Sequence, residues 1–357
     1  MKKRIAVFQN DLGVGGIQKS LVNLLKNLDY SRLAVDLYLS ERGDFWDAAF
    51  PKELNVRYLR PTPRLYSFVP FALARRLLRY DFPPEPYDLA IDFNSYQCSC
   101  AVGATTVPAK RRVMWIHNDV EIKLRNEWKY RVLWHFFKGK FQFYDGFVPV
   151  SGALAEPFRR ASGVTDKPFT VIQNYIDVSE IRRKAAEAPG VPAPDPACLN
   201  LVALGRLCHQ KGYDLMLPLF ARAYAELREL RLYIIGDGPD RAALEAQCAE
   251  LGISEAVSFL GNQSNPYAIM AQMDAFLSTS RYEGQPLNIM EARVLGLPLY
   301  CSKNLEKYAE GLVGYDDLLP ALLHAERREK QPDDLLAYNQ TILDSLLTLA
   351  EQDASGQ

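Results

Sequence analysis

The sequence contains no apolar run long enough to span a bilayer, which takes about 18 to 20 consecutive apolar residues. Its basic start, residues 1–4, is followed by only four apolar residues, Ile5–Phe8, before polar residues return. The apolar core of a secretory signal is longer, at ~7–15 residues. We therefore interpret Ile5–Phe8 as a buried first strand and expect a cytoplasmic protein.

Metal-binding cysteine patterns are also missing. The six cysteines form no C-x-x-C pair, and no cluster of histidines lies beside them, so a structural zinc site is not expected. We expect reduced thiols in the core at Cys98, Cys100, Cys198, Cys208, Cys248 and Cys301.

Net charge is nearly absent, at −1, which argues against a nucleic-acid binder that works through bulk electrostatics. The charges are nevertheless unevenly distributed. Residues 1–181 carry 26 lysines and arginines against 19 acidic residues, whereas residues 182–357 carry 16 against 24. Halves of opposite sign suggest two units that face different partners.

Short apolar runs alternate with helical patterns along most of the chain. Apolar runs bounded by turns, with helices between them, predict parallel sheets covered on both faces. Four prolines and a glycine at residues 185–198 interrupt the alternation. The chain length favours two domains of roughly 150 residues. We therefore predict two doubly wound α/β domains, at 1–180 and 198–318, and a helical segment at 319–357.

The expected strands of the first domain are Arg4–Gln9, Ala34–Leu39, Asp88–Phe93, Arg112–Ile116 and Gly146–Val150. Those of the second are Asn200–Leu204, Arg231–Ile235, Ala256–Leu260, Ala275–Thr279 and Leu299–Cys301. Helices are expected at Ile17–Leu28, Tyr213–Glu229, Asp240–Leu251 and Leu287–Leu295. Ligands of doubly wound domains bind at the carboxyl ends of the strands, so the loops that follow strands are the candidate functional segments.

The first such loop is glycine-rich and lies at residues 13–16. Glycines such as Gly15 and Gly16 let backbone N–H groups approach a phosphate, and the helix N-terminus adds a favourable dipole. The pattern is neither G-x-G-x-x-G nor a P-loop. A tight turn without a ligand is an equally good interpretation.

A second loop, Gly205–Gly212, carries Arg206 and Lys211 directly after an expected strand. Two cations five positions apart, in a loop that enters a helix, could clamp a diphosphate. The alternative is a solvated basic loop. The flanking glycines and the position after a strand favour the phosphate site.

A third loop, Gly236–Pro239, begins like a dinucleotide-binding fingerprint. The third glycine is missing, and no acidic residue ends a strand about 20 residues further on, where the ribose partner belongs. We therefore predict a close turn between strand and helix here.

The fourth loop, residues 281–291, places Glu283 and Glu291 on either side of a helix start at Gly284–Leu287. Two carboxylates that bracket free backbone amides suit a ligand with hydroxyls at both ends and phosphates between them, such as a nucleotide sugar. The alternative is an acid that stabilises the helix dipole together with a surface glutamate.

Taken in order, these segments resemble the retaining glycosyltransferases of family 4, which have the GT-B fold of two Rossmann-like domains across a cleft. The resemblance runs over nearly the whole chain and points to enzymes of cell-envelope or capsular polysaccharide synthesis. The matching segments are Gly15-Gly16, Trp115–Asn118, Val148–Ser151, Val171–Asp177, Gly205–Gly212, Gly236–Pro239, Phe259–Gly261 and Glu283–Glu291.

The resemblance implies a role for each candidate residue. Arg206 and Lys211 would bind the donor diphosphate, and Glu283 would bind hydroxyls of the donor sugar. Glu291 would hold the ribose, and His117 would lie beside the donor sugar from the other domain. The remaining donor-binding positions would be Gly15, Gly16, Gly205, Gly261, Asn262, Gly284, Gln285, Pro286 and Leu287, with the nucleobase against the backbone around Gly261–Gln263.

The sequence departs from the family at two places. Gln173 stands where proline is usual, and residues 299–304 replace the usual strand and glycine-rich turn. No D-x-D occurs, so a chelated metal is not indicated, and Arg206, Lys211 and the helix N-terminus would meet the leaving-group charge. No cofactor is expected beyond the donor, for which a UDP-sugar is favoured. A catalytically silent GT-B partner subunit and a nucleotide-sugar epimerase are the alternatives.

Two basic segments of the first half suggest where an acceptor approaches. Residues 54–80 contain six arginines and no acidic residue, and residues 110–140 contain nine lysines and arginines against three acids. Interleaved apolar residues would let such segments rest on an anionic inner leaflet, with Arg75, Arg76 and Arg79 on a helix beside a strip that includes Phe71 and Leu78. A saccharide or a lipid-linked acceptor would fit. The alternative is a solvated basic face.

Overall fold

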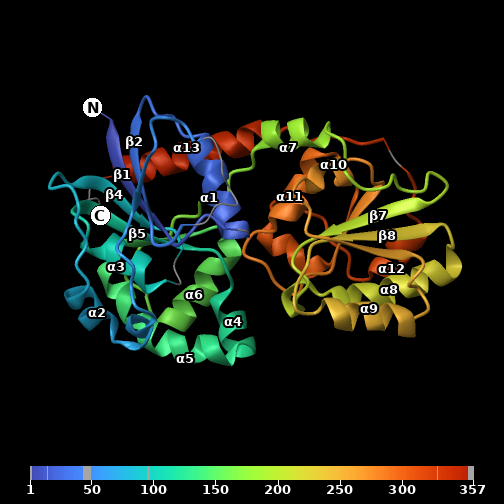
Figure 1. Cartoon of the computed structure of the whole chain (residues 1–357), viewed down its shortest axis with the longest axis horizontal. Coiled ribbons are helices and arrows are strands. Elements are labelled where there is room, and N and C mark those ends of the chain that lie inside the picture. The colour runs from blue at the N-terminus through green and yellow to red at the C-terminus, as the bar shows by residue number, and fades with distance from the viewer. Residues whose placement is uncertain (1, 14, 43–49, 95–96, 328, 353–357) are drawn as a thin grey trace. The chain divides into compact units, whose positions relative to one another are not determined.

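The computed structural model describes residues 2–13, 15–42, 50–94, 97–327 and 329–352 (Figure 1). The chain divides into two compact units. Unit 1 comprises Met1–Tyr175 together with Leu336–Gln357, and unit 2 comprises Ile176–Leu335.

Unit 1 is built on a six-stranded parallel sheet in the order β3-β2-β1-β4-β5-β6. Its strands are β1 (Lys3–Gln9), β2 (Leu33–Leu39), β3 (Asn55–Tyr58), β4 (Tyr87–Asp92), β5 (Ala109–Ile116) and β6 (Gly146–Pro149). The apolar run Ile5–Phe8 is buried in β1, near the middle of the sheet, as its composition predicts.

Helices connect these strands. They are α1 (Gly16–Lys26), α2 (Phe71–Leu77), α3 (Cys98–Thr106), α4 (Val120–Asn126), α5 (Trp128–Phe137), α6 (Ala155–Ser162) and α13 (Leu336–Glu351), with the 3-10 helices η1 (Arg64–Phe68), η2 (Lys138–Phe143) and η3 (Gly152–Leu154). Among the described residues of the whole chain, no helix is both long enough and apolar enough to cross a membrane.

The last helix, α13, returns to the first domain. It lies against β1 and β4 (Figure 1), with Ile342, Leu346 and Leu349 buried. The chain therefore has no separate segment at 319–357: α12 (Leu318–Leu323) belongs to unit 2, whereas α13 completes unit 1. The reason is burial, because the apolar face of α13 fills one side of the unit 1 sheet.

Unit 2 contains a five-stranded parallel sheet in the order β11-β10-β7-β8-β9. Its strands are β7 (Leu199–Leu204), β8 (Leu230–Ile235), β9 (Val257–Gly261), β10 (Ala275–Ser278) and β11 (Leu299–Cys301). Its helices are α7 (Val178–Ala185), α8 (Tyr213–Glu226), α9 (Arg241–Glu250), α10 (Pro266–Met270), α11 (Leu287–Val294) and α12, with η4 (His209–Lys211) and η5 (Lys303–Tyr308). The core beneath α8 is closely packed around Met216 and Phe220.

Both sheets follow the same plan. In each, the first strand along the chain lies inside the sheet, the second and third lie on one side of it, and the fourth lies on the other. In unit 2 the strand order reverses between β7 and β10, so the loops at the carboxyl ends of these two strands leave in opposite directions. This is the position at which doubly wound domains bind ligands.

The predicted strands are all present, with ends that differ by at most three residues. The edge strand β3 and the short helices α3 to α7 and α10 were not predicted, whereas α2 lies where a helix from Phe71 was expected and ends before Arg79. The cysteines carry free thiols; five are buried as expected, and Cys208 is half-buried.

Candidate functional site

The loops that follow β7 and β10 meet at the reversal point of unit 2. They are Gly205–Gly212 and Thr279–Glu283, which belong to two of the predicted motifs. Their contact follows from the strand order, because β7 and β10 are neighbours although more than 70 residues separate them. The topology thus brings Lys211 to Glu283.

A buried ion pair lies where the two loops meet. Lys211 Nζ donates to Glu283 Oε1 at 2.7 Å, and Gln210 Nε2 lies 3.4 Å from Glu283 Oε2. The side chain of Glu283 is only 7% exposed and that of Lys211 18%. Each carboxylate oxygen therefore faces a donor, and a lysine with three N–H groups can serve one further acceptor.

The Lys211 loop is fixed by its backbone and by a second ion pair. Gly212 has φ +67°, and Thr279 Oγ1 donates to its carbonyl at 2.8 Å. Arg281 donates to both carboxylate oxygens of Asp214, at 2.7 and 2.6 Å, and to the carbonyl of His209 at 2.9 Å. These hydrogen bonds hold the pKa of the Asp214 carboxyl below its ordinary value. Arg281 thereby ties the segment before Glu283 to the turn that carries Lys211.

Three residues of this contact, Gln210, Asp214 and Arg281, have no role predicted from sequence motifs. Asn304 is a further such residue: its side-chain amide donates to the carbonyls of Ser280 and Arg281 at 3.0 and 3.1 Å. Two of these residues could have been suspected from the sequence, because Gln210 and Arg281 lie inside the predicted motifs. Their partners lie in distant segments, so only the fold shows what they contact.

The Gly236–Pro239 loop is a close turn, as predicted. A side chain at Gly236 would meet the carbonyl oxygen of Gly205 at 2.1 Å, and one at Gly238 would meet that of Leu207 at 2.2 Å. Leu207 N donates to the Asp237 carbonyl at 3.0 Å. These glycines therefore let two backbone loops pack against each other.

Glu283 precedes α11 in the chain and Glu291 lies within it. No side chain caps the helix at Pro286. Gln285 and Glu291 are buried, and Tyr267 OH donates to Glu291 Oε1 at 3.3 Å. Burial raises the pKa of Tyr267 well above its ordinary value. Because Glu283 and Glu291 are both buried, neither is the surface glutamate of the alternative interpretation.

Of the remaining candidates of unit 2, Gly284 and Pro286 are buried, whereas Arg206 and Asn262 are exposed. Arg206 is exposed and makes no hydrogen bond or ion pair with the residues that the structure describes. Gly261 has φ +67°, and its carbonyl accepts from Gly236 N at 2.8 Å. Asn262, next in the chain, is exposed. The segment that the resemblance assigns to the nucleobase thus begins beside the glycine turn.

The unit 1 candidates lie at the carboxyl ends of β1 and β5. His117 follows β5 and is 7% exposed; its Nε2 lies 2.8 Å from the carbonyl of Phe93, and its ring centroid lies 4.7 Å from that of Phe93. Burial lowers the pKa of His117 to about 4. The imidazole is therefore neutral at pH 7, with Nε2–H donated to the carbonyl and Nδ1 left as an acceptor.

The glycine loop of unit 1 is organised by an acidic residue. The Asp11 carboxylate accepts from Gly13 N at 2.7 Å and from Gln18 Nε2 at 3.3 Å. Gly15 is the N-cap of α1, Gly16 is its first residue, and no side chain caps this helix. The start of α1 thus has no side-chain cap, whereas the Gly13 amide of the loop already donates to Asp11.

Two family models match the chain. "Glycosyltransferase Family 4" matches residues 14–180, and "Glycosyl transferases group 1" matches residues 199–313. The lipopolysaccharide 1,6-galactosyltransferase of Salmonella typhimurium is 25% identical over 310 residues, which cover 81% of this chain and 77% of that enzyme.

Solved structures show the same fold. Anabaena HepE superposes with a TM-score of 0.62 at 19% identity, over 98% of this chain and 95% of that one. S. aureus TarM superposes with a TM-score of 0.68 at 11% identity, over 98% and 100%. The chain is a glycosyltransferase with the GT-B fold.

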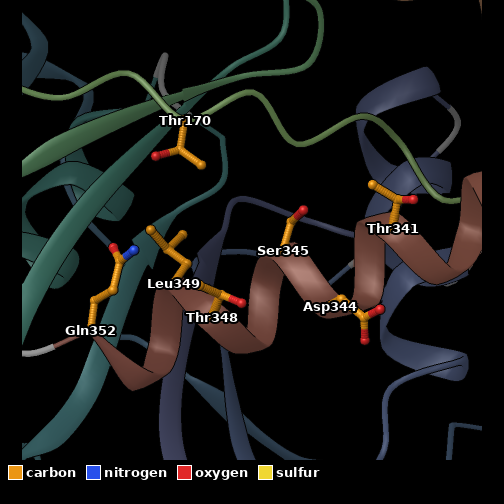
Figure 2. A pocket seen from close by; sticks show the side chains of 7 residues that line it. All are labelled: Thr170, Thr341, Asp344, Ser345, Thr348, Leu349 and Gln352. Atoms are coloured by element: carbon orange, nitrogen blue, oxygen red, sulfur yellow. The ribbon is translucent and has the colours of Figure 1, made fainter.

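One hollow of the glycosyltransferase is separate from these residues. It has a volume of about 300 Å³ and lies on unit 1 between α13 and the segment at Thr170 (Figure 2). Its lining is Thr170, Thr341, Asp344, Ser345, Thr348, Leu349 and Gln352. It contains none of the candidate residues. Among the described residues, no group of three or more His, Cys, Asp or Glu side chains could hold a metal ion.

His117→Asn should remove a pH dependence of the stability of the glycosyltransferase. Between pH 4 and 6.5 the unfolded chain holds a proton on His117 that the folded chain lacks. This group therefore makes the free energy of unfolding rise with pH by about 1.4 kcal/mol per unit in that window. Denaturant unfolding at several pH values measures the slope. The control His135→Asn, at an exposed position of α5, should keep this slope. Equal slopes in wild type and His117→Asn would show that the pKa of His117 is not lowered by burial.

Proposed function

We propose that the chain transfers a sugar from a UDP-sugar, with retention of anomeric configuration and without a metal, to a saccharide or lipid-linked acceptor in cell-envelope polysaccharide synthesis. The observation that carries the proposal is the buried Lys211–Glu283 pair beside the start of α11. The name of the Salmonella relative supports the lipopolysaccharide context. HepE and TarM, both solved with UDP, support the choice of nucleotide.

Lys211 can donate to the Glu283 carboxylate and to a phosphate of the donor at the same time. With one N–H on Glu283, its remaining N–H groups can donate to a phosphate oxygen of the donor. Glu283 then accepts hydrogen bonds from sugar hydroxyls while its charge stays compensated. Arg206, exposed and without a partner among the described residues, adds a second cation for the diphosphate.

Catalysis follows from where negative charge develops. As the bond from the anomeric carbon to the phosphate oxygen breaks, charge grows on the diphosphate, where Lys211, Arg206 and the backbone N–H groups at the start of α11 stabilise it. The acceptor oxygen forms its bond on the same face of the sugar, and its proton passes to the departing phosphate oxygen. Glu291, buried beside Tyr267, accepts from the ribose hydroxyls.

The donor class is tested with a panel of UDP-, GDP-, ADP- and dTDP-sugars. A UDP-sugar should raise the melting temperature most, because UDP is the proposed nucleotide. With that donor and a panel of saccharide and lipid-linked acceptors, the product should keep the anomeric configuration of the donor, as measured by NMR. A larger shift with another nucleotide would reject UDP, and an inverted product would reject retention. Tight donor binding without any transfer would favour the catalytically silent partner subunit.

Activity in the same assay should survive excess EDTA. The proposed charge stabilisation comes from Lys211, Arg206 and the N-terminus of α11, so chelation removes nothing that the reaction needs. Initial rates with EDTA, and with added Mg²⁺ or Mn²⁺ as the control, make the comparison. Loss of turnover in EDTA and its return with either metal would show that the metal-free mechanism is wrong.

A further inference from the structure

Three neighbouring elements of unit 1 expose large apolar side chains. The elements are η1, α2 and α5; the Phe68 and Phe136 rings of η1 and α5 lie 6.2 Å apart, and Phe71 of α2 lies 5.7 Å from Phe143 of η2, which continues α5. Figure 1 shows α2 and α5 at the same end of unit 1. The exposed side chains are Leu65 (71%), Phe68 (52%), Leu73 (47%), Leu77 (54%), Trp128 (64%) and Val132 (48%). We call this set, with the cations around it, the docking face.

Helical spacing gathers these residues on the outer side of each helix. Leu73 and Leu77 are four apart on α2, as are Trp128 and Val132 on α5, so each pair forms one stripe. The opposite side of α2 is buried at Phe71 and Ala74. On α2, the exposed apolar stripe is therefore distinct from the side that packs against the core of unit 1.

The structure corrects the residues expected at such a surface. Phe71 is 4% exposed, Leu78 is half-buried, and Arg75 turns inward to donate to the Thr105 carbonyl at 2.9 Å and to lie over the Phe143 ring at 4.6 Å. In the second basic segment, Lys140 is buried 3.8 Å from Asp92. Phe71, Arg75 and Lys140 therefore pack inside unit 1, and other residues form its exposed surface here.

The cations that do border the apolar stripes have few acidic neighbours. They are exposed at Arg76, Arg79, Arg125, Lys129, Arg131 and Lys138. The exposed acid within α4 and α5 and their junction is Glu127, and Glu121 is paired with Arg160 at 2.8 Å. A rim of positive charge around exposed leucine and tryptophan matches an anionic head-group layer above hydrocarbon.

We propose that the docking face binds the surface of a bilayer that contains anionic lipids. Leu73, Leu77 and Trp128 enter the head-group boundary, and the arginines and lysines contact the phosphates. The inference deepens the proposed function and rests on it for its purpose, because a lipid-linked acceptor is presented at such a surface. Vesicle binding itself requires neither donor nor acceptor, so its failure is distinguishable from failure of the transfer reaction.

The test is co-sedimentation of the full chain with vesicles of phosphatidylcholine alone or mixed with phosphatidylglycerol. Wild type should bind the mixed vesicles and leave the neutral ones, and binding should weaken with salt, because the screening length falls from ~10 Å at 0.1 M to ~3 Å at 1 M. The variant Arg76→Gln/Arg79→Gln/Lys129→Gln should bind at least about tenfold more weakly, since each cation near an anionic surface contributes severalfold. Leu77→Asn/Trp128→Asn should also weaken binding, because it removes the part that enters the bilayer.

Each variant has a matched control on unit 2. Arg222→Gln/Arg228→Gln/Lys307→Gln removes the same charges from exposed positions, and Leu215→Asn/Val313→Asn removes two exposed apolar side chains. Both controls should bind like wild type. The far-ultraviolet circular dichroism spectrum and the melting temperature should be unchanged in all four variants, which shows that both units are folded. Failure of wild type to bind mixed vesicles at low salt, or equal losses in a variant and its control, would overturn the proposal. Loss of self-association in the docking-face variants, with vesicle binding retained, would instead assign the face to a second copy of the chain.

Discussion

Lys211→Ala should lower the turnover number by a factor of about 100 to 1000, which is the usual loss when one donor to a developing oxyanion is removed. The affinity for UDP should fall by a smaller factor. The difference arises because the leaving diphosphate gains negative charge in the transition state, where the ammonium group stabilises it most. Steady-state kinetics with the donor and calorimetric titration with UDP measure the two effects separately.

The same substitution should also destabilise unit 2, and this effect needs its own control. The Glu283 carboxylate is 7% exposed in the wild type, and without Lys211 it keeps Gln210 as its one hydrogen-bond donor among the described residues. Lys211→Ala/Glu283→Gln removes that unpaired charge and should recover part of the melting temperature but none of the turnover. Lys307→Ala, an exposed lysine of the same unit, should change neither. Wild-type turnover in folded Lys211→Ala would exclude Lys211 from the phosphate site.

Most of the sheet architecture could be predicted from residue patterns, and the exceptions have physical causes. Runs such as Ile5–Phe8 and Leu201–Ala203 are apolar throughout because both faces of a parallel strand are covered. β3 lacks this signal because Asn55, Arg57 and Tyr58 are exposed at the sheet edge. The return of α13 to unit 1 has no local signal, since an amphipathic helix does not indicate which sheet covers it.

The candidate site likewise combines features that neighbouring residues predict with contacts that only the fold creates. The glycine turn at Gly236 could be predicted from its own residues, whereas the partner of Glu283 lies 72 positions away at Lys211. The strand order explains that contact, because β7 and β10 are adjacent. Arg281 and Asp214 resemble ordinary surface charges in the sequence, and their bidentate pairing depends on two loops meeting. The burial of His117 likewise depends on Phe93, which directly follows the neighbouring strand β4.

The packing of the glycine turn predicts a large loss of stability in Gly236→Ala. The φ of Gly236 is +132°, a region that other residues rarely adopt. An alanine Cβ would also lie 2.1 Å from the carbonyl oxygen of Gly205. The unfavourable φ and the close carbonyl oxygen both belong to the backbone, so rotating a side chain relieves neither. We expect a loss of about 4 kcal/mol or more in the free energy of unfolding, at the upper end for single substitutions.

Gly252→Ala is the matched control for Gly236→Ala, because it separates backbone strain from collision. Gly252 has φ +67° but no atom within 4 Å of an added Cβ, so only the strain of about 1 kcal/mol remains. Denaturant unfolding followed by far-ultraviolet circular dichroism measures both variants. All four tryptophans precede residue 135, so their fluorescence reports on unit 1 and should show whether that unit is affected. Equal losses in the two variants would mean that strain alone acts at Gly236. The close backbone contact between the Gly205 and Gly236 loops would then add nothing to the loss of stability.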